Sequence, residues 1–244
     1  MTVRVAIVGS SHSAGLGVHG RSFAVRAAEL LGAVQTLQLS RSAQVVDQVG
    51  ADTIERIAEF RPGVVLLSFG AAEGHVHPSR VLQAVLDRFA PAGWRGPDGV
   101  EPRPYFSRRP ARRLHQRLVS TAKVLVKRVL IGVTGGFHRL GAADFEAGLR
   151  DLLNRLGPVP KVLVGLWPVD ERMFPRSNTV LRRHDDILRA VAAERDDAVY
   201  VATAGSVRCW EDFLDDHAHL NEAGHERVAA LVAAAGQARL RTRT

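Results

Sequence analysis

The 244-residue sequence has a single cysteine and no long apolar stretch. Cys209 alone cannot form an intramolecular disulfide, and it excludes a cysteine-rich metal site. Because no apolar run approaches the roughly 20 residues that span a bilayer, we expect a soluble protein. Residues 1–9 combine one arginine with a short apolar run and no cleavage site, which predicts a strand rather than a signal peptide. These features favour a cytoplasmic protein.

The whole chain has a net charge of +8, and the charge is unevenly distributed. The segment from Arg103 to Arg128 contains nine lysines or arginines and no acidic residue. Within residues 110–131, apolar side chains recur at spacings of three and four, which predicts an amphipathic helix. The basic residues that this spacing places off the apolar stripe are Arg113, Arg117, Lys123 and Lys127.

Three roles remain open for this basic helix. Its charges can form a solvated face, dock the protein on an anionic membrane surface or substrate, or bind nucleic acid. Nucleic acid is disfavoured as a partner because few aromatic residues beyond Tyr105 and Phe106 are interleaved with the charges.

Apolar runs and helical patterns alternate along the rest of the chain. The predicted strands are residues 3–9, 33–39, 64–69, 161–166 and 198–201, and the predicted helices are 22–31, 45–60, 142–156, 180–194 and 222–235. Such alternation indicates a parallel sheet with helices on both faces. We therefore predict an α/β fold, a flavodoxin-like three-layer sandwich with a central five-stranded parallel sheet. A single domain over residues 1–244, with a basic helical insertion at about 91–141, is the simplest organisation.

A serine after the first strand and an Asp-x-x-His pattern before the last helix form a candidate catalytic set. Ser11 follows Gly9 and Ser10, and Asp216 precedes His219 by three residues. A carboxylate can hold a histidine tautomer while the other ring nitrogen takes the proton of a serine, which is a weak nucleophile without such a base. We therefore predict Ser11 as nucleophile, with Asp216 and His219 as its base pair.

Structural roles compete for the same residues. Ser11 can be a helix N-cap, Asp216 and His219 can form a capping turn, and His217 is a rival base.

His12, His75 and His77 match no standard zinc spacing, so we expect no metal. The Gly-x-Gly-x-x-Gly pattern at 15–20 begins six residues after the strand closes, and no acidic residue ends the second strand, so we expect no nucleotide cofactor.

The order of these blocks resembles the SGNH, or GDSL-type, esterases and acyltransferases over residues 3–235. The family's Gly-Asp-Ser block falls on Gly9-Ser10-Ser11. The most specific part is the block from Asp216 to Asn221, followed by Gly224-His225. The resemblance implies that Ser11 is the nucleophile and that its own backbone N–H is one donor to the oxyanion.

The resemblance also implies an oxyanion site, and here the sequence departs from the family. Ser10 replaces the family's aspartate, and Ala43 stands where a glycine N–H normally provides a second donor. The block Gly-x-Asn-Asp falls on Gly70-Ala71-Ala72-Glu73, so the asparagine side chain that completes the site is missing at Ala72. The candidates for the missing contact are Glu73, His75 and a group from the insertion.

Together these residues predict a serine-dependent ester hydrolase or acyltransferase. It would act through an acyl-enzyme on an O-acylated small molecule, carbohydrate or lipid. The rival hypothesis is a catalytically weak or inactive binding protein with the same fold, motivated by Ser10 and Ala72. Labelling by a fluorophosphonate probe separates the two, because only an activated Ser11 reacts with it.

Overall fold

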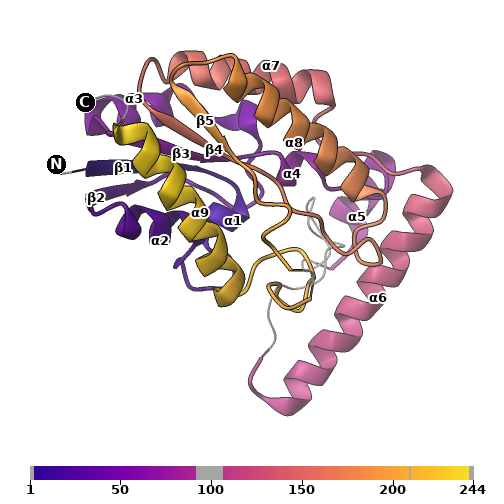
Figure 1. Cartoon of the computed structure of the whole chain (residues 1–244). Coiled ribbons are helices and arrows are strands. Elements are labelled where there is room, and N and C mark those ends of the chain that lie inside the picture. Colours follow the sequence, from indigo (N-terminus) through magenta and orange to yellow (C-terminus); the bar gives the residue numbers. More distant parts are fainter. Residues whose placement is uncertain (1–2, 92–106, 209, 242–244) are drawn as a thin grey trace.

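The computed structural model describes residues 3–91, 107–208 and 210–241, which contain a five-stranded sheet (Figure 1). Its strands are β1 (Val3–Gly9), β2 (Ala33–Gln38), β3 (Val64–Ser68), β4 (Lys161–Val164) and β5 (Ala198–Val201). All neighbouring strands are parallel, in the order β2-β1-β3-β4-β5. This order confirms the predicted flavodoxin-like sandwich, and it places a topological switch point between β1 and β3, where such sheets bind ligands.

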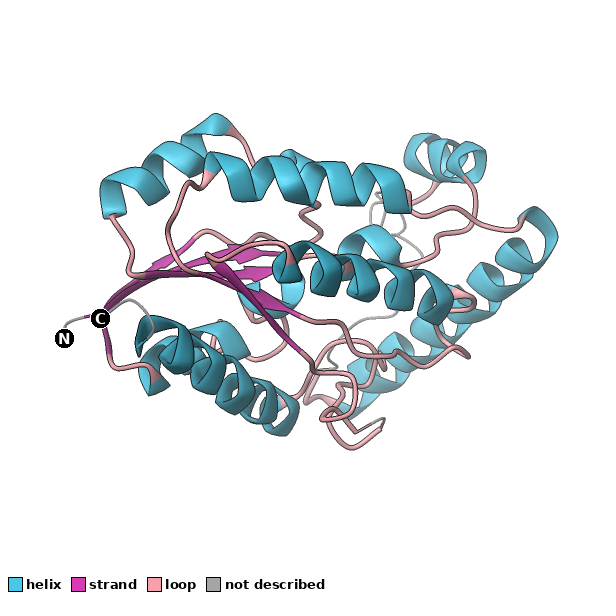
Figure 2. Cartoon of the chain, turned by 45° about the horizontal axis from the view of Figure 1, so that its top comes forward, coloured by secondary structure: helices cyan, strands magenta, loops and turns pink. Residues whose placement is uncertain are grey.

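Two layers of helices cover the sheet (Figure 2). On one face lie α2 (Phe23–Leu30) and α9 (Glu222–Arg241), and on the other α3 (Ala51–Phe60), α7 (Ala142–Arg155) and α8 (Ser177–Ala193). The side chains of β1 alternate between these layers, so that Ala6 and Val8 pack toward α7, whereas Val5 and Ile7 pack toward α2.

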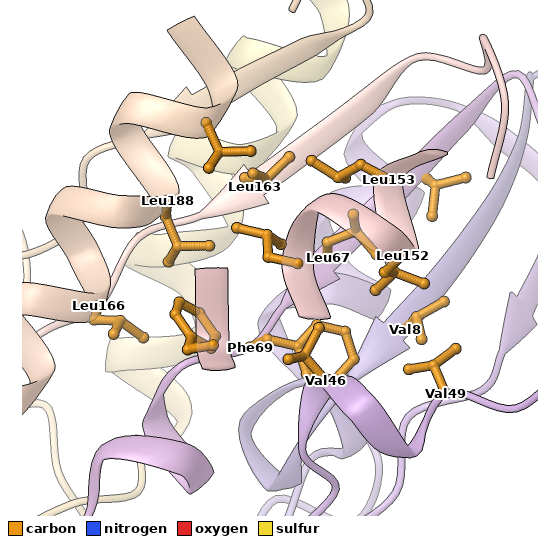
Figure 3. Close-up of a cluster of buried hydrophobic side chains, with 14 of the residues drawn as sticks. Val8, Val46, Val49, Leu67, Phe69, Leu152, Leu153, Leu163, Leu166 and Leu188 are labelled. Atoms are coloured by element: carbon orange, nitrogen blue, oxygen red, sulfur yellow. The ribbon is translucent and has the colours of Figure 1, made fainter. Parts of the chain in front are cut away.

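The core beneath α7 and α8 is formed by apolar side chains of the sheet and of the helices on that face. Val8 and Leu67 project from the sheet, and Leu152 and Leu188 meet them from the two helices (Figure 3). These side chains are at most 1% exposed. Burial of each one stabilises the fold by about 2 kcal/mol, which fixes the strand ends that position the polar residues.

Several helices differ from the predicted pattern. The helix predicted over residues 45–60 is interrupted, because a 3-10 turn (Val46–Gln48) is followed by extended backbone at Val49 and Gly50 before α3 begins. Three short helices were not predicted: α1 (Ser11–Ala14), α4 (Ala71–Gly74) and α5 (Arg80–Phe89). Four-residue helices are too short to produce an apolar periodicity, which explains why the sequence does not reveal α1 and α4.

The helix predicted over residues 110–131 is α6 (Pro110–Thr134), which stands beyond the carboxyl ends of the strands (Figure 1). Lys123 and Lys127 are buried, and the Lys127 Nζ lies 4.2 Å from the centroid of the Phe174 ring. A lysine can be buried where its methylene stem packs and its ammonium meets an aromatic face. The interpretation of these two lysines as part of a solvated face is therefore wrong. The predicted apolar stripe is instead exposed, at Leu114, Leu118, Leu125 and Val129.

Within the described ranges, no helix combines the length and apolar character needed to cross a membrane.

Candidate active site

The end of β1 places Ser11 at the carboxyl edge of the sheet. The strand ends at Gly9, and Ser11 is the first residue of α1. The Ser10 N–H donates to the Ser68 carbonyl at 3.1 Å, which ties the turn to the end of β3. A side chain at Gly9 would collide with that same carbonyl. Ser11 is 9% exposed, so the turn holds its hydroxyl in a nearly buried position.

A chain of hydrogen bonds joins Ser11, His219 and Asp216. The Ser11 Oγ lies 2.8 Å from His219 Nε2, and His219 Nδ1 lies 2.5 Å from Asp216 Oδ2. When Nδ1 carries the proton and donates it to the carboxylate, Nε2 is left to accept from the Ser11 hydroxyl. The structure thus brings together three side chains that are separated by up to 208 positions in sequence.

The Asp216 carboxylate is buried and bonded by both oxygens. Its Oδ1 accepts from the N–H groups of Ala218 (3.1 Å) and His219 (3.0 Å), and its Oδ2 faces the imidazole. Burial by itself raises the pKa of this carboxyl, but the charge of His219 and these hydrogen bonds outweigh it and lower the pKa below its ordinary value. Asp216 is therefore ionised at neutral pH and holds the imidazole from one side.

The turn that carries His219 is built into the start of α9. The Leu214 N–H donates to the His219 carbonyl at 2.8 Å, and the Asn221 Oδ1 accepts from the Gly224 N–H at 3.0 Å. Asn221 thus caps the helix by its side chain. The rival base His217 contacts other residues. Its ring centroid lies 4.2 Å from that of Trp210, and its Nδ1 lies 4.0 Å from Asp170 Oδ2.

His12 stacks on the candidate base, a role that its sequence position alone does not indicate. The two imidazole rings are 4.8 Å apart and inclined by 27°. His12 Nε2 donates to the Ala218 carbonyl at 3.1 Å, which also accepts from Trp167 Nε1 at 3.4 Å. Burial and the nearby charge of His219 lower the pKa of His12 to about 3, so the ring is neutral. His12 therefore supports the turn before His219 without adding charge.

Glu73 and Gly70 are bonded to each other in the structure. The Glu73 Oε2 accepts from the Gly70 N–H at 2.7 Å, and its Oε1 accepts from the Val46 N–H at 2.8 Å. The resemblance to the SGNH family places both residues in the block that contributes to the oxyanion site. Both carboxyl oxygens of Glu73 are occupied by backbone N–H groups, and the Gly70 N–H is already used. The structure thus indicates that Glu73 joins the loops after β2 and β3 rather than contacting an oxyanion.

Ala43 has the backbone geometry of a glycine, with a φ of 59°. Its carbonyl accepts from Arg139 Nη1 at 2.6 Å, and among the described residues its own N–H has no hydrogen-bond partner. A left-handed alanine is strained by about 1–2 kcal/mol. Ala72 lies on α4 with a methyl side chain that cannot donate, and the Ser10 side chain is buried beside the nucleophile.

The histidine and glycine patterns singled out in the sequence take ordinary places in the described part of the chain. No group of three His, Cys, Asp or Glu side chains is placed to hold a metal ion there. The glycine pattern at 15–20 folds into a turn after α1, in which the Gly20 N–H donates to the Gly15 carbonyl at 3.2 Å.

Comparison with known proteins gives matches at the level of structure. No family model and no curated protein matches the sequence. The fold matches LAE5, an α/β hydrolase from the metagenome of Lake Arreo, Spain, with 15% identity, a TM-score of 0.60 and coverage of 96% of this chain and 95% of that one. It also matches a lipase/acylhydrolase from Enterococcus faecalis, with 13% identity, a TM-score of 0.60 and coverage of 98% and 97%.

A family 3 carbohydrate esterase from Clostridium thermocellum matches at 15% identity, with a TM-score of 0.57 and coverage of 99% of this chain and 98% of that one. A lipolytic protein of the G-D-S-L family from Desulfitobacterium hafniense matches at 10% identity and a TM-score of 0.57, covering 96% and 99%. The chain has the SGNH-hydrolase fold. The carboxyl edge of its sheet holds Ser11, His219 and Asp216.

Glu73 offers a test of how the loops at the carboxyl edge of the sheet are held together. Above the raised pKa of about 7, where the Glu73 carboxyl is ionised, Glu73→Gln places an amide NH₂ against one of the two backbone N–H donors. Under these conditions we expect the free energy of unfolding to fall by about 2 kcal/mol. Chemical denaturation measures the change, with the exposed Glu59→Gln as the matched control. Equal stability of the two variants would contradict a structural role for Glu73.

The same residue predicts a pH dependence of stability. Burial raises the pKa of Glu73 from 4.5 to about 7, despite the hydrogen bonds that oppose the shift. Between these values the folded chain binds a proton that the unfolded chain has released, so stability falls as pH rises. The contribution is complete below pH 4.5 and is lost as pH rises through about 7. Denaturation curves from pH 4 to 8 should show this slope in the wild type and a weaker one in Glu73→Gln.

Proposed function

We propose that this protein is a serine-dependent ester hydrolase or O-acyltransferase that acts through an acyl-enzyme. The observation that carries the proposal is the hydrogen-bonded chain from Ser11 Oγ through His219 to the buried Asp216. This geometry matches the needs of acyl transfer, in which a hydroxyl, a neutral imidazole and an ionised carboxylate act together. The esterases and lipases among its structural neighbours support the same reaction class.

Each member of the triad has a defined step. His219 Nε2 takes the proton of Ser11 as Oγ attacks the ester carbonyl, and the imidazolium that forms is stabilised by Asp216. The same proton is then given to the departing alcohol, which leaves an acyl group on Ser11. Water in a hydrolase, or an acceptor hydroxyl in a transferase, loses its proton to His219 and takes the acyl group. His219 returns that proton to the Ser11 Oγ as it leaves, which restores the free enzyme.

The negative charge on the carbonyl oxygen needs donors that are not already used. We assign two to the backbone, the N–H groups of Ser11 and Ala43. We assign the third, in place of the asparagine missing at Ala72, to His75. Among the described residues the buried Nε2 of His75 has no hydrogen-bond partner, and its ring shares a small cavity with His12. Burial and the charge of Lys127 hold its pKa well below the ordinary value, so it is a neutral donor.

His75→Ala should lower kcat by about 100-fold with little change in KM, because an oxyanion contact forms fully only in the transition state. His75→Asn should recover part of this loss, since an amide N–H replaces the imidazole N–H. The exposed His115→Ala is the matched control. An unchanged kcat in His75→Ala, with the fold intact by circular dichroism, would remove His75 from the mechanism and leave the two backbone donors.

A series of p-nitrophenyl esters of increasing chain length, with and without sugar acceptors, tests the reaction type. A hydrolase releases the free acid at a rate that acceptors do not change. A transferase forms acylated sugar, which mass spectrometry detects, and its nitrophenol release rises with acceptor concentration. Absence of turnover on every ester, together with no fluorophosphonate labelling of Ser11, would instead support a binding protein that keeps the SGNH fold.

A further inference from the structure

The apolar side of α6 faces solvent along most of the helix. Six large side chains are between 41% and 82% exposed, namely Leu114, Leu118, Leu125, Val126, Val129 and Val133. On a helical projection they lie within about a third of a turn of one another, so they form one continuous strip. We call these six residues the α6 strip. A contiguous apolar strip of this size marks an interaction surface, whereas apolar residues exposed singly need no explanation.

The opposite side of α6 is fixed to the rest of the protein. The residues buried there are Ser120, Lys123, Val124, Lys127 and Ile131. Lys127 sits over the Phe174 ring, and the Thr134 Oγ1 donates to the Pro78 carbonyl at 3.2 Å. The strip cannot turn inward without exposing these contacts and breaking them. Its exposure is therefore a consequence of how α6 is anchored.

The charges beside the strip define the partner. Arg112 and Arg128 are exposed and flank it on its two sides, and Arg108 and Arg109 are exposed just before the helix. No aspartate or glutamate occurs anywhere in residues 107–134. An apolar strip between arginines is the pattern of a helix that lies in the headgroup region of an anionic bilayer. A second copy of the chain would bring like charges together, because the helix has no acid to pair with them.

We propose that α6 docks this protein flat on an anionic lipid surface, with the α6 strip buried among the acyl chains and its arginines at the phosphates. The helix stands beyond the carboxyl ends of the strands, on the side of the molecule where α1, which begins at Ser11, lies (Figure 1). Its 25 residues span about 37 Å, enough for a lateral contact along the membrane. The proposal is independent of the proposed function, because docking needs neither Ser11 nor turnover.

Co-sedimentation with vesicles tests the docking. The full-length protein is mixed with vesicles of phosphatidylcholine alone and with vesicles that also contain phosphatidylglycerol. We expect binding to the mixed vesicles only, and we expect it to weaken at high salt because screening removes the attraction of the arginines. Equal binding at low and high salt, or no binding to either vesicle, would overturn the proposal.

Two variants separate the apolar from the charged part of the surface. Leu118→Gln with Leu125→Gln should weaken binding by at least about tenfold, since each leucine loses its burial in the bilayer. Arg112→Gln with Arg128→Gln should weaken it by about fivefold for each arginine. The matched control is Leu30→Gln with Val34→Gln, which removes two equally exposed apolar side chains away from α6 and should bind as the wild type does.

Light scattering after gel filtration tests the alternative, in which a second copy of the chain binds the α6 strip. If the wild type is a dimer that Leu118→Gln with Leu125→Gln converts to a monomer, and vesicles do not bind, the strip is a dimer interface and the proposal is wrong. Ser11→Ala separates the test of docking from the test of the proposed catalytic activity. It should bind vesicles as the wild type does, so a failure of the proposed chemistry leaves this result unchanged.

Discussion

Replacement of Ser11 by alanine should lower kcat/KM on an activated ester by about 10⁴-fold or more, because the acyl-enzyme can no longer form. The residual rate comes from the oxyanion donors acting on water. Labelling by a fluorophosphonate should disappear in the same variant, since the probe forms its covalent bond with the activated hydroxyl. Initial rates of p-nitrophenol release and the mass of the labelled protein measure the two effects.

Ser13→Ala is the matched control for this variant. Ser13 lies two residues away on α1, is fully buried and donates to the Ser10 carbonyl at 3.0 Å, so it shares the environment of Ser11 without contacting His219. We expect it to keep labelling and to change activity far less. Labelling that persists in Ser11→Ala, or that vanishes equally in Ser13→Ala, would contradict Ser11 as the nucleophile.

Asp216→Asn should be the second most damaging change, with kcat lower by about 10³- to 10⁴-fold and KM little altered. Asp216 is buried, is held ionised by its hydrogen bonds and contacts His219 Nδ1 at 2.5 Å. An amide of the same size keeps the packing, but it does not stabilise the imidazolium that forms as Ser11 attacks, and it favours the wrong tautomer. Steady-state kinetics together with a thermal unfolding curve separate the catalytic effect from any loss of fold.

Two neighbours of Asp216 provide controls. Asp215 is exposed, so Asp215→Asn should remain within about threefold of the wild type, as surface changes away from a site usually do. His217, the rival base, contacts Trp210 rather than Ser11, so His217→Asn should also retain activity, and asparagine tolerates its φ of 58°. If His217→Asn were as damaging as His219→Asn, the assignment of the base would be wrong.

The basic helix α6 and α1, which begins at the proposed nucleophile Ser11, lie on the same side of the molecule (Figure 1). The SGNH core places Ser11 at the carboxyl edge of its sheet, and α6 extends from that edge with arginines beside an apolar strip. If both proposals hold, an ester presented at an anionic surface would be turned over faster than the same ester in bulk solution. Activity on vesicle-embedded substrate in the Leu118→Gln and Leu125→Gln double variant would measure that link directly.

Much of the architecture follows from local patterns in the sequence. Four of the five strands are short, largely apolar runs, whereas β2 is half polar and more exposed. The alternation of strands with helices permits few topologies other than a doubly wound parallel sheet. The meeting of Ser11 with His219 could also be predicted. One residue follows a central strand and the other precedes the last helix, and parallel strands deliver such positions to a common edge.

Other features depend on neighbours that the sequence does not place. In the sequence, Glu73 is an acidic residue near the end of a strand. In the structure its two oxygens accept hydrogen bonds from the N–H groups of Val46 and Gly70, which the packing of two loops brings close to it. From the sequence, His12 can be considered as a metal ligand, and its stacking on the His219 ring becomes visible only in the folded structure. The periodicity of α6 correctly predicts a helix with two unlike sides.

Which side of α6 is buried was decided by tertiary structure alone. Periodicity shows how residues are distributed around a helix, but not what each side will meet. Lys127 is buried because the Phe174 ring lies where its ammonium ends, and the leucines opposite are left exposed because no described element of the chain covers them. The sequence by itself therefore determined the order of strands, helices and reactive residues. The three-dimensional packing decided their partners, because burial and hydrogen bonding are properties of contacts between distant segments.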